Sequence, residues 1–405
     1  MKDKRFAANS GYYACECRFM QKEYDYVIDY GPDLYERLSP ELKANLARMV
    51  SESYFAKNDN YNAKKHLDLY LSGAGEVSRK DSYYAGVLSY SMGSYPAAIE
   101  AFKPVVSDTD EIGQSAYYYS ANSYLKHRNK LAALKCFQSA ASCDFDKEIK
   151  EDAMFNFAKL SFDVNQDISQ FEKYAEAYPA SGKEDVINTY MSASFLLQKD
   201  YQAAIDLMRK IKNPTPDVER NLQKAYLYRA AALMDNGGYS SAADLLQEAI
   251  SLDASPQVTN LANYCLAECY FRNENYDHAL QIDNYLLRNG DFKNYDEYRL
   301  LPYNIGYAAF KKEDFETAVG KFNEFVENGA GDLDKDARLR LGDAYFLQGL
   351  YKEAAGEYEQ VETRYHDGDI YASYQRAMAF GLMGEDKNKI AILARATADN
   401  SSADL

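Results

Sequence analysis

The chain has 405 residues, 47% of them hydrophobic, and its 62 Asp and Glu outnumber its 46 Lys and Arg, giving a formal net charge of -16. This hydrophobic content excludes global disorder, and the length allows two or three compact domains or one extended array. A negative net charge without a local basic stripe argues against a nucleic-acid partner, so basic or neutral partners are favoured.

The N-terminal segment, residues 1–5, is charged and does not lead into the apolar core of a signal peptide. No apolar stretch approaches the roughly 20 residues that cross a bilayer, so we expect no membrane span. The localisation stays open between a cytoplasmic protein and a periplasmic or envelope-associated one whose export signal was removed.

From the N-terminus onward, one mostly small position recurs in the predicted second helix of successive helix pairs. Neighbouring copies of this position are 35 to 39 residues apart along the whole chain. The residue has to be small because the first helix of the pair crosses there. The positions are Val27, Ala63, Ala98, Ala133, Ile168, Ala204, Ala242, Ala279, Ala318, Ala354 and Lys389.

Two further positions support this packing. An aromatic residue one turn after the small residue is expected to fill the groove beside it, and a glycine on the first helix allows the two helices to approach closely. The aromatic residues are Phe102, Phe137, Phe322 and Tyr358, and the glycines are Gly86, Gly306 and Gly342.

The clearest copy spans residues 340–355 and reads RLGDAYFLQGLYKEAA. Its Leu-Gly pair, its tyrosines and its alanine closely resemble the tetratricopeptide repeat. No segment alternates with period two for long enough to make a strand. We therefore expect an all-α fold, a right-handed α-α superhelix or solenoid of about ten to eleven helix pairs.

We expect this array to be continuous. Residues 1–38 are assigned to a first, degenerate pair, residues 39–385 to the continuous array, and residues 386–405 to a last helix and a polar tail. The copy near residues 150–180 is weak, because Ile168 is not small and no aromatic precedes it in the turn. The apolar residues of the last helix predict end-to-end self-association or continuation into a longer array.

No catalytic or metal-binding pattern is recognisable, so we predict that the chain is not an enzyme and needs no cofactor or metal. The four histidines are scattered over different copies without a nucleophile in a recognisable motif. The six cysteines include no C-x-x-C pair. Cys265 and Cys269 lie one helical turn apart and are predicted to share a buried face.

The resemblance implies that first-helix residues line a concave binding face, and mapping by phase places an aromatic stripe there. Tyrosine suits partner binding because it buries a large ring at low rotamer cost and keeps a hydroxyl group. The alternative is that the 38 tyrosines of this Trp-free chain only pack between copies. The predicted partner-binding residues are Tyr83, Tyr90, Tyr118, Asn122, Tyr264, Phe271, Tyr303, Tyr307, Phe310 and Phe346.

We therefore predict a protein-protein interaction scaffold that holds a segment of an unidentified partner protein. Residues 176–181 and 314–318 resemble bacterial envelope members of the family, which implies a role in envelope assembly or transport. The carboxylate clamp of the co-chaperone members is absent, because Tyr118 rather than Lys precedes Asn122 by one turn. The alternative function is that of a glycan-binding, ligand-binding or catalytic α/α protein.

Overall fold

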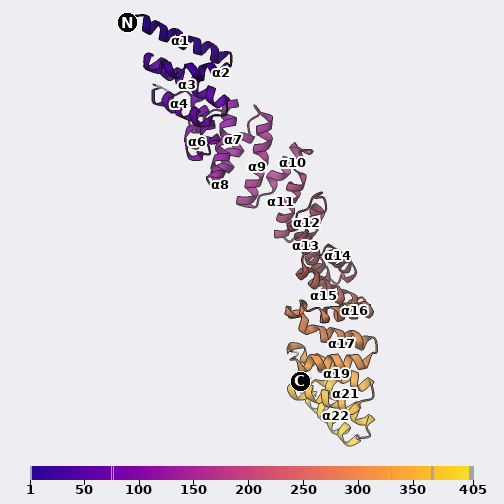
Figure 1. Cartoon of the computed structure of the whole chain (residues 1–405). Coiled ribbons are helices and arrows are strands. Elements are labelled where there is room, and N and C mark those ends of the chain that lie inside the picture. Colours follow the sequence, from indigo (N-terminus) through magenta and orange to yellow (C-terminus); the bar gives the residue numbers. More distant parts are fainter. Residues whose placement is uncertain (1, 74, 76, 330, 366–368, 401–405) are drawn as a thin grey trace. The chain divides into compact units, whose positions relative to one another are not determined.

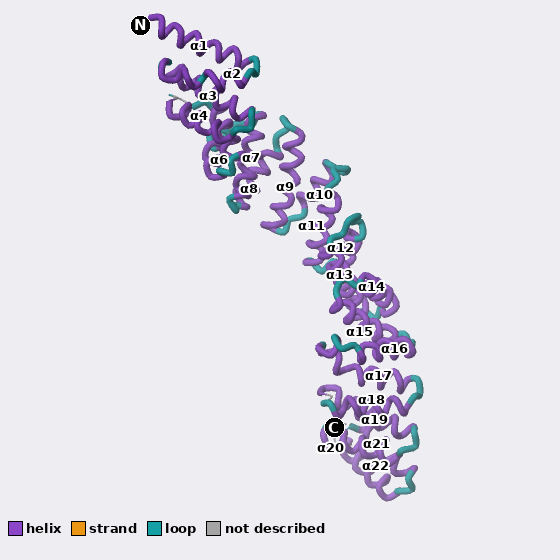
Figure 2. Tube along the Cα trace, viewed as in Figure 1, coloured by secondary structure: helices purple, strands orange, loops and turns teal. Residues whose placement is uncertain are grey.

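The computed structural model describes residues 2–73, 75, 77–329, 331–365 and 369–400, and within these ranges the side chains of residues 8–395 (Figure 1). This described part is helical and contains no strand (Figure 2). Its 22 α-helices follow one another as eleven successive pairs, so the all-α prediction is confirmed. We call the odd-numbered helices A helices and the even-numbered ones B helices. None of the described helices combines the length and apolar character that a bilayer crossing requires.

The chain divides into two compact units, residues up to Ser194 and residues from Phe195 onward. The helices of the first unit are α1 (Lys2–Met20), α2 (Tyr24–Tyr30), η1 (Pro32–Arg37), α3 (Pro40–Ala56), α4 (Asn60–Gly73), α5 (Arg79–Ser91), α6 (Tyr95–Phe102), α7 (Glu111–Lys126), α8 (Lys130–Ala141), α9 (Lys147–Asn165), α10 (Ser169–Ala177) and most of α11 (Glu184–Leu197).

The second unit begins in the last residues of α11. Its other helices are α12 (Tyr201–Met208), α13 (Pro216–Asp235), α14 (Tyr239–Leu252), α15 (Pro256–Arg272), α16 (Tyr276–Arg288), η2 (Phe292–Asn294), η3 (Asp296–Leu300), α17 (Leu301–Lys311), α18 (Phe315–Glu327), η4 (Gly331–Leu333), α19 (Asp334–Leu347), α20 (Tyr351–Arg364), α21 (Ile370–Leu382) and α22 (Asp386–Asn400).

The B helices hold the stack together inside each unit. In the second unit α16 contacts both α15 and α17, and α18 and α20 sit in the same way between the A helices on either side of them. One pair alone cannot bury both faces of its helices, so each pair depends on its neighbour for a core.

The recurring small position lies at the centre of this packing. Nine of its copies are buried to within 1% exposure, which confirms that they face the A helices: Val27, Ala63, Ala98, Ala133, Ala204, Ala242, Ala279, Ala318 and Ala354. The fifth copy differs, because Ile168 is the N-cap of α10 rather than a residue inside it. Phe171 and Tyr174 supply the buried side of that helix instead. Lys389 lies inside α22 but is only half-buried.

The predicted close approach of glycine and aromatic ring is also confirmed. A Cβ added to Gly342 would lie 2.7 Å from the ring of Tyr358, and one added to Gly306 would lie 3.0 Å from that of Phe322. Real Cβ atoms hardly ever come this close to a ring. The ring therefore occupies the space that the glycine leaves free.

The turn between the A and B helices repeats as well. In ten copies the residue five positions before the small site has a positive φ, which places it in the left-handed region. Only four of these residues are glycine, the type that adopts this conformation without strain. In chain order they are Lys22, Asn58, Gly93, Arg128, Lys199, Gly237, Glu274, Glu313, Gly349 and Gly384.

A polar clamp that the sequence analysis did not predict ties neighbouring pairs together. Gln114 on α7 is fully buried, donates to the carbonyl of Asp146 at 3.0 Å, and accepts from the Asp146 N–H at 2.7 Å. Arg79 on α5 bonds the carbonyl of Val105 at 2.8 Å in the same way. Gln223 on α13 donates to the carbonyl of Ala249 at 2.9 Å. These side chains bond backbone groups near the C-terminal end of a B helix, as at Ala249, or in the loop that follows it, as at Val105 and Asp146.

Candidate functional site

All ten residues predicted to bind a partner lie on A helices, and all ten are half-buried. Four belong to α5 and α7 in the first unit, and six belong to α15, α17 and α19 in the second. Each ring therefore packs on one side against the helical stack and keeps part of its surface in solvent. We describe the two units in turn.

In the first unit the hydroxyl of Tyr118 is already engaged. It donates to Asp152 Oδ2 on α9 at 2.7 Å, and burial together with this carboxylate raises the pKa of the phenol. Asn122 donates to the carbonyl of Tyr118 at 3.1 Å. Tyr90 packs against Tyr119, with ring centroids 5.2 Å apart. The polar groups of Tyr118 and Asn122 therefore contribute to the packing of the stack.

In the second unit two tyrosines of α17 share one carboxylate of α19. Tyr303 and Tyr307 donate to Asp336 Oδ2 at 2.7 and 2.6 Å. Burial and this bond raise the pKa of Tyr307 to about 12, and burial is the larger cause. Both rings also lie against Phe322 of α18. The hydroxyl groups and part of the rings of Tyr303 and Tyr307 therefore pack between copies of the repeat.

The aromatic residues near the ends of the A helices meet the first aromatic residue of the following B helix. Phe271 contacts Tyr276, with centroids 5.4 Å apart, and the rings meet edge to face. The same contact joins Phe310 to Phe315 and Phe346 to Tyr351. These rings brace the turn between the two helices of a pair.

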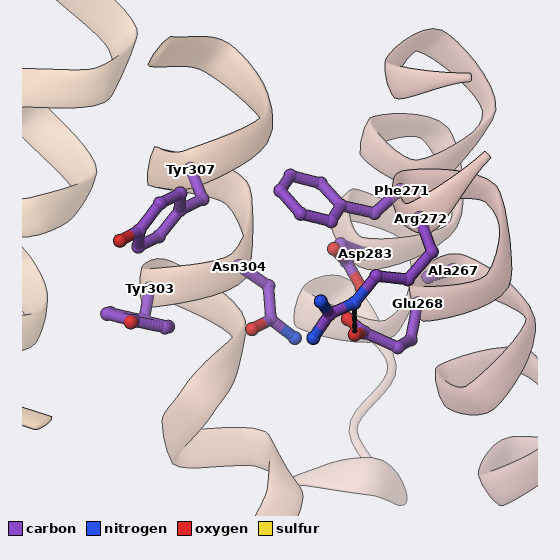
Figure 3. Close-up of a pocket in the computed structure, with 8 residues that line it drawn as sticks. All are labelled: Ala267, Glu268, Phe271, Arg272, Asp283, Tyr303, Asn304 and Tyr307. Atoms are coloured by element: carbon purple, nitrogen blue, oxygen red, sulfur yellow. Dashed lines mark hydrogen bonds and ion pairs between the residues drawn. The ribbon is translucent and has the colours of Figure 1, made fainter. Parts of the chain in front are cut away.

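Three of the predicted residues come together around a pocket in the second unit (Figure 3). The cavity measures about 270 Å³ and lies between α15, α16 and α17. Its lining consists of Ala267, Glu268, Phe271, Arg272, Asp283, Tyr303, Asn304 and Tyr307. Tyr264, also on α15, is not among the residues that line it.

The pocket exists because one copy of the repeat has a short polar residue at a position that is large and apolar in most other copies. Asp283 lies four residues after the small residue Ala279, at the position that a large apolar side chain fills in seven other copies. Those buried groove-filling residues are Leu67, Phe102, Phe137, Met208, Leu246, Phe322 and Tyr358. Aspartate is shorter than any of them, so the groove stays partly empty beside it.

The carboxyl group of Asp283 is buried without a full set of partners. The side chain is 3% exposed, and Oδ1 has no hydrogen-bond partner among the described residues. Burial first, and then the charge of Glu268, raise its pKa to about 8. A buried polar atom without a partner costs free energy, so this group is poised to accept a donor that enters the pocket.

The other polar groups of the pocket lie near its mouth. Glu268 accepts from the Arg272 guanidinium Nε at 2.6 Å, so these two charges form a pair on α15. Figure 3 shows the Asn304 amide on α17 pointing toward this pair across the opening, with Asp283 set deeper. The predicted aromatic residues of the lining lie on α15 and α17, whereas Asp283, Glu268, Arg272 and Asn304 were not predicted.

The remaining chemistry of the described residues is sparse. No group of three or more His, Cys, Asp or Glu among them could hold a metal ion. Cys269 is buried and Cys265 half-buried, and both are free thiols, as their predicted shared face implied. Burial raises the pKa of Cys265 to about 11 and that of Cys269 to about 12, which keeps both thiols protonated and unreactive.

The chain was compared with protein families, curated sequences and solved structures. No curated protein sequence matches the chain. Among solved structures it is similar to YrrB, described as a tetratricopeptide protein with an unusual peptide-binding site, at 22% identity and a TM-score of 0.38 over 44% of this chain and 88% of that one. It is also similar to BtubC from P. vanneervenii, at 16% identity and a TM-score of 0.39 over 51% and 90% of the two chains.

A third similar structure is the TPR2AB domain of yeast Sti1 in complex with an HSP90 peptide, at 15% identity and a TM-score of 0.36 over 66% of this chain and 98% of that one. Likenesses at this level assign no partner to this chain. The family model described as tetratricopeptide repeat matches residues 227–294 and 303–369. The first segment contains the part of the pocket on α15 and α16 and the second the part on α17. The matched segments are therefore identified as tetratricopeptide repeats.

Proposed function

We propose that the chain is a protein-interaction scaffold whose A-helix face in the second unit holds an extended or helical segment of a partner protein. The observation that carries this proposal is the pocket between α15 and α17, which is flanked by half-exposed aromatic rings on both helices. Phe271, Tyr303 and Tyr307 supply the ring surface, and Asp283 supplies an open acceptor below it. Rings and a few convergent polar groups are the usual composition of a binding hot spot.

The cavity has room for at least one side chain of a partner. Its volume of about 270 Å³ falls just below the roughly 300–1,000 Å³ of typical small-molecule sites. The four predicted residues on α5 and α7 extend the proposal to a second contact face in the first unit.

Two finer expectations belong to the same proposal. The resemblance to bacterial envelope proteins suggests that the partner segment belongs to an envelope assembly or transport machinery. Self-association through the C-terminal end is supported by Ile390 on α22, which is 66% exposed. The second expectation is tested by sedimentation of the chain and of Ile390→Lys, which should shift an oligomer to a monomer.

The binding face is tested with a displayed library of random peptides selected against the folded chain. Selected peptides should slow amide hydrogen exchange in α15 and α17, because a bound segment covers those helices. Asn304→Ala should weaken the peptides at least tenfold, since it removes a polar group at the pocket mouth without removing a core ring. Tyr374→Ala is the matched control, because this side chain is 51% exposed on α21 and does not line the pocket.

Two results would reject the proposed face. One is selection of peptides whose exchange protection lies on B helices or on unrelated loops. The other is equal loss of binding in the Asn304 and Tyr374 variants, which would mean that the peptides adhere to exposed aromatic surface in general. Circular dichroism of each variant confirms that it is folded before binding is measured.

A further inference from the structure

The pocket between α15, α16 and α17 carries an uncompensated acidic group. Glu268 and Arg272 neutralise each other through their 2.6 Å ion pair. Asp283 then stands as the one remaining carboxyl group in the lining, and Oδ1 has no partner among the described residues. A carboxylate in such a place is stabilised most by a cation that brings its own hydrogen-bond donors.

The walls of the pocket also suit a cation on an apolar stem. Phe271 and Tyr307 line the same cavity from α15 and α17, with ring centroids 6.3 Å apart and planes nearly perpendicular. Aromatic rings attract a nearby cation and pack well against methylene groups. Asn304 lines the same pocket, and its side-chain amide adds a further polar group.

The size of the cavity fits a side chain as well. A single water needs roughly 10–15 Å³ of such volume, far less than the 270 Å³ present here. The chain as a whole carries a formal charge of -16, which attracts basic segments toward this face.

We infer that this pocket binds one basic side chain of the partner segment, a lysine ammonium or an arginine guanidinium, with Asp283 as its counter-ion. The inference rests on the proposed function for the peptide that carries the side chain, but the pocket itself can be probed without a peptide. Phe271 and Tyr307 flank the stem of the incoming side chain, and the charged head reaches Asp283.

The first experiment uses single amino-acid probes. Nα-acetyl-lysine amide and Nα-acetyl-arginine amide are compared with Nα-acetyl-norleucine amide and Nα-acetyl-citrulline amide. These two controls are similar in shape but carry no charge. With 13C-labelled aspartate, the charged probes should shift the Asp283 Cγ resonance, which is assigned by its loss in Asp283→Asn. The neutral probes should leave that resonance in place. An equal response to charged and neutral probes, or no response to either, would overturn the inference.

The second experiment uses the peptides selected against the A-helix face. Replacing their basic residue by norleucine or citrulline should weaken binding at least tenfold to the natural chain and less than threefold to Asp283→Asn. This non-additivity isolates the pair. Tyr374→Ala leaves the pocket unchanged and should keep the preference for a basic residue. Comparison of the lysine and arginine arms identifies which head group is preferred.

The outcomes separate the two proposals. Peptides that protect α15 and α17 from exchange but bind equally well without their basic residue would overturn the inference and leave the scaffold proposal standing. If no peptide binds that face while the charged amides still shift the Asp283 resonance, the scaffold proposal fails and the cation site is supported. The Asp283 variant is expected to fold, because Asn has nearly the same size as Asp and Asp283 Oδ1 has no hydrogen-bond partner to lose among the described residues.

Discussion

The stability of Asp283→Asn relative to the natural chain should rise as the pH is raised from about 5 to about 8. In the folded chain the pKa of this carboxyl lies at about 8, above its ordinary value of 3.8. The folded state therefore holds a proton that the unfolded state releases, so the free energy of unfolding falls as pH rises from about 4 to 8. Asn does not titrate, so the unfolding free energy of Asp283→Asn lacks this fall with rising pH.

The size of the effect follows from the same values. Between about pH 5 and pH 8 the natural chain should lose up to about 4 kcal/mol relative to Asp283→Asn, at about 1.4 kcal/mol for each pH unit. The buried amide of Asn brings a cost of its own, about 1–3 kcal/mol, which is independent of pH. The quantity to measure is therefore how the difference in unfolding free energy between Asp283→Asn and the natural chain changes with pH. The value of that difference at a single pH does not test the prediction.

Urea denaturation followed by circular dichroism at both pH values measures this difference. Repeat arrays do not always unfold in one step, so hydrogen exchange of the amides in α15 to α17 should accompany the melts. Glu268→Gln is the intermediate case, since removing the second cause of the raised pKa should flatten the pH dependence in part. A constant difference between the natural chain and Asp283→Asn at both pH values would show that Asp283 is ionised in the fold and would refute the reasoning.

Three further results are expected. Gly342→Ala should lose about 1–3 kcal/mol of stability, because its Cβ would meet the Tyr358 ring. Gly356→Ala, on the exposed side of α20, should gain about 0.5–1 kcal/mol. Equal effects of the two substitutions in thermal melts would contradict this packing. Gln114→Leu should cost about 1–3 kcal/mol by leaving the Asp146 N–H unpaired, and a neutral result would mean that water replaces the clamp. Binding of a basic peptide should strengthen as pH rises toward 8, because Asp283 must ionise first.

That pH dependence has to be read against every charged or titratable group around Asp283. Tyr264, Glu268 and Arg272 face it from α15, and Tyr303 and Tyr307 line the pocket from α17. Burial and Asp336 raise the pKa of Tyr307 to about 12, so it stays neutral in this range. A titration of peptide affinity that persists in Asp283→Asn would assign the effect to another group.

Regular packing was predictable from the sequence because it depends on size at fixed intervals. A buried Ala at the crossing point and an aromatic ring beside a glycine follow from sterics alone, and Ala354, Tyr358 and Gly342 occupy their predicted places. The fifth pair was harder to place, because Ile168 continues the numerical spacing while Phe171 and Tyr174 carry the actual core of α10. An interval alone does not reveal that a helix begins one residue later.

The pocket was missed for a different reason. A search for chemical motifs looks for reactive residues near one another in sequence, and Asp283 has no such neighbour. Its signal is a mismatch of type, a carboxylate at the register position where Phe322 and Tyr358 stand in later copies. Aligning the copies by their small residue and asking which groove residue is polar would have pointed to α16.

The same alignment explains why several hydroxyl groups of the aromatic stripe are already bonded within the helical stack. The donor and acceptor of the tyrosine bonds are separated by nearly one repeat, 34 residues for Tyr118 and Asp152 and 33 for Tyr303 and Asp336. Residues at that separation face each other on neighbouring A helices, so a tyrosine followed by an aspartate one repeat later is expected to bond to it. The hydroxyls then fix one pair to the next, and what remains for a partner is the ring surface. Binding specificity should therefore depend on polar groups that the stack leaves unpaired, and Asp283 Oδ1 on α16 is the one that faces the pocket.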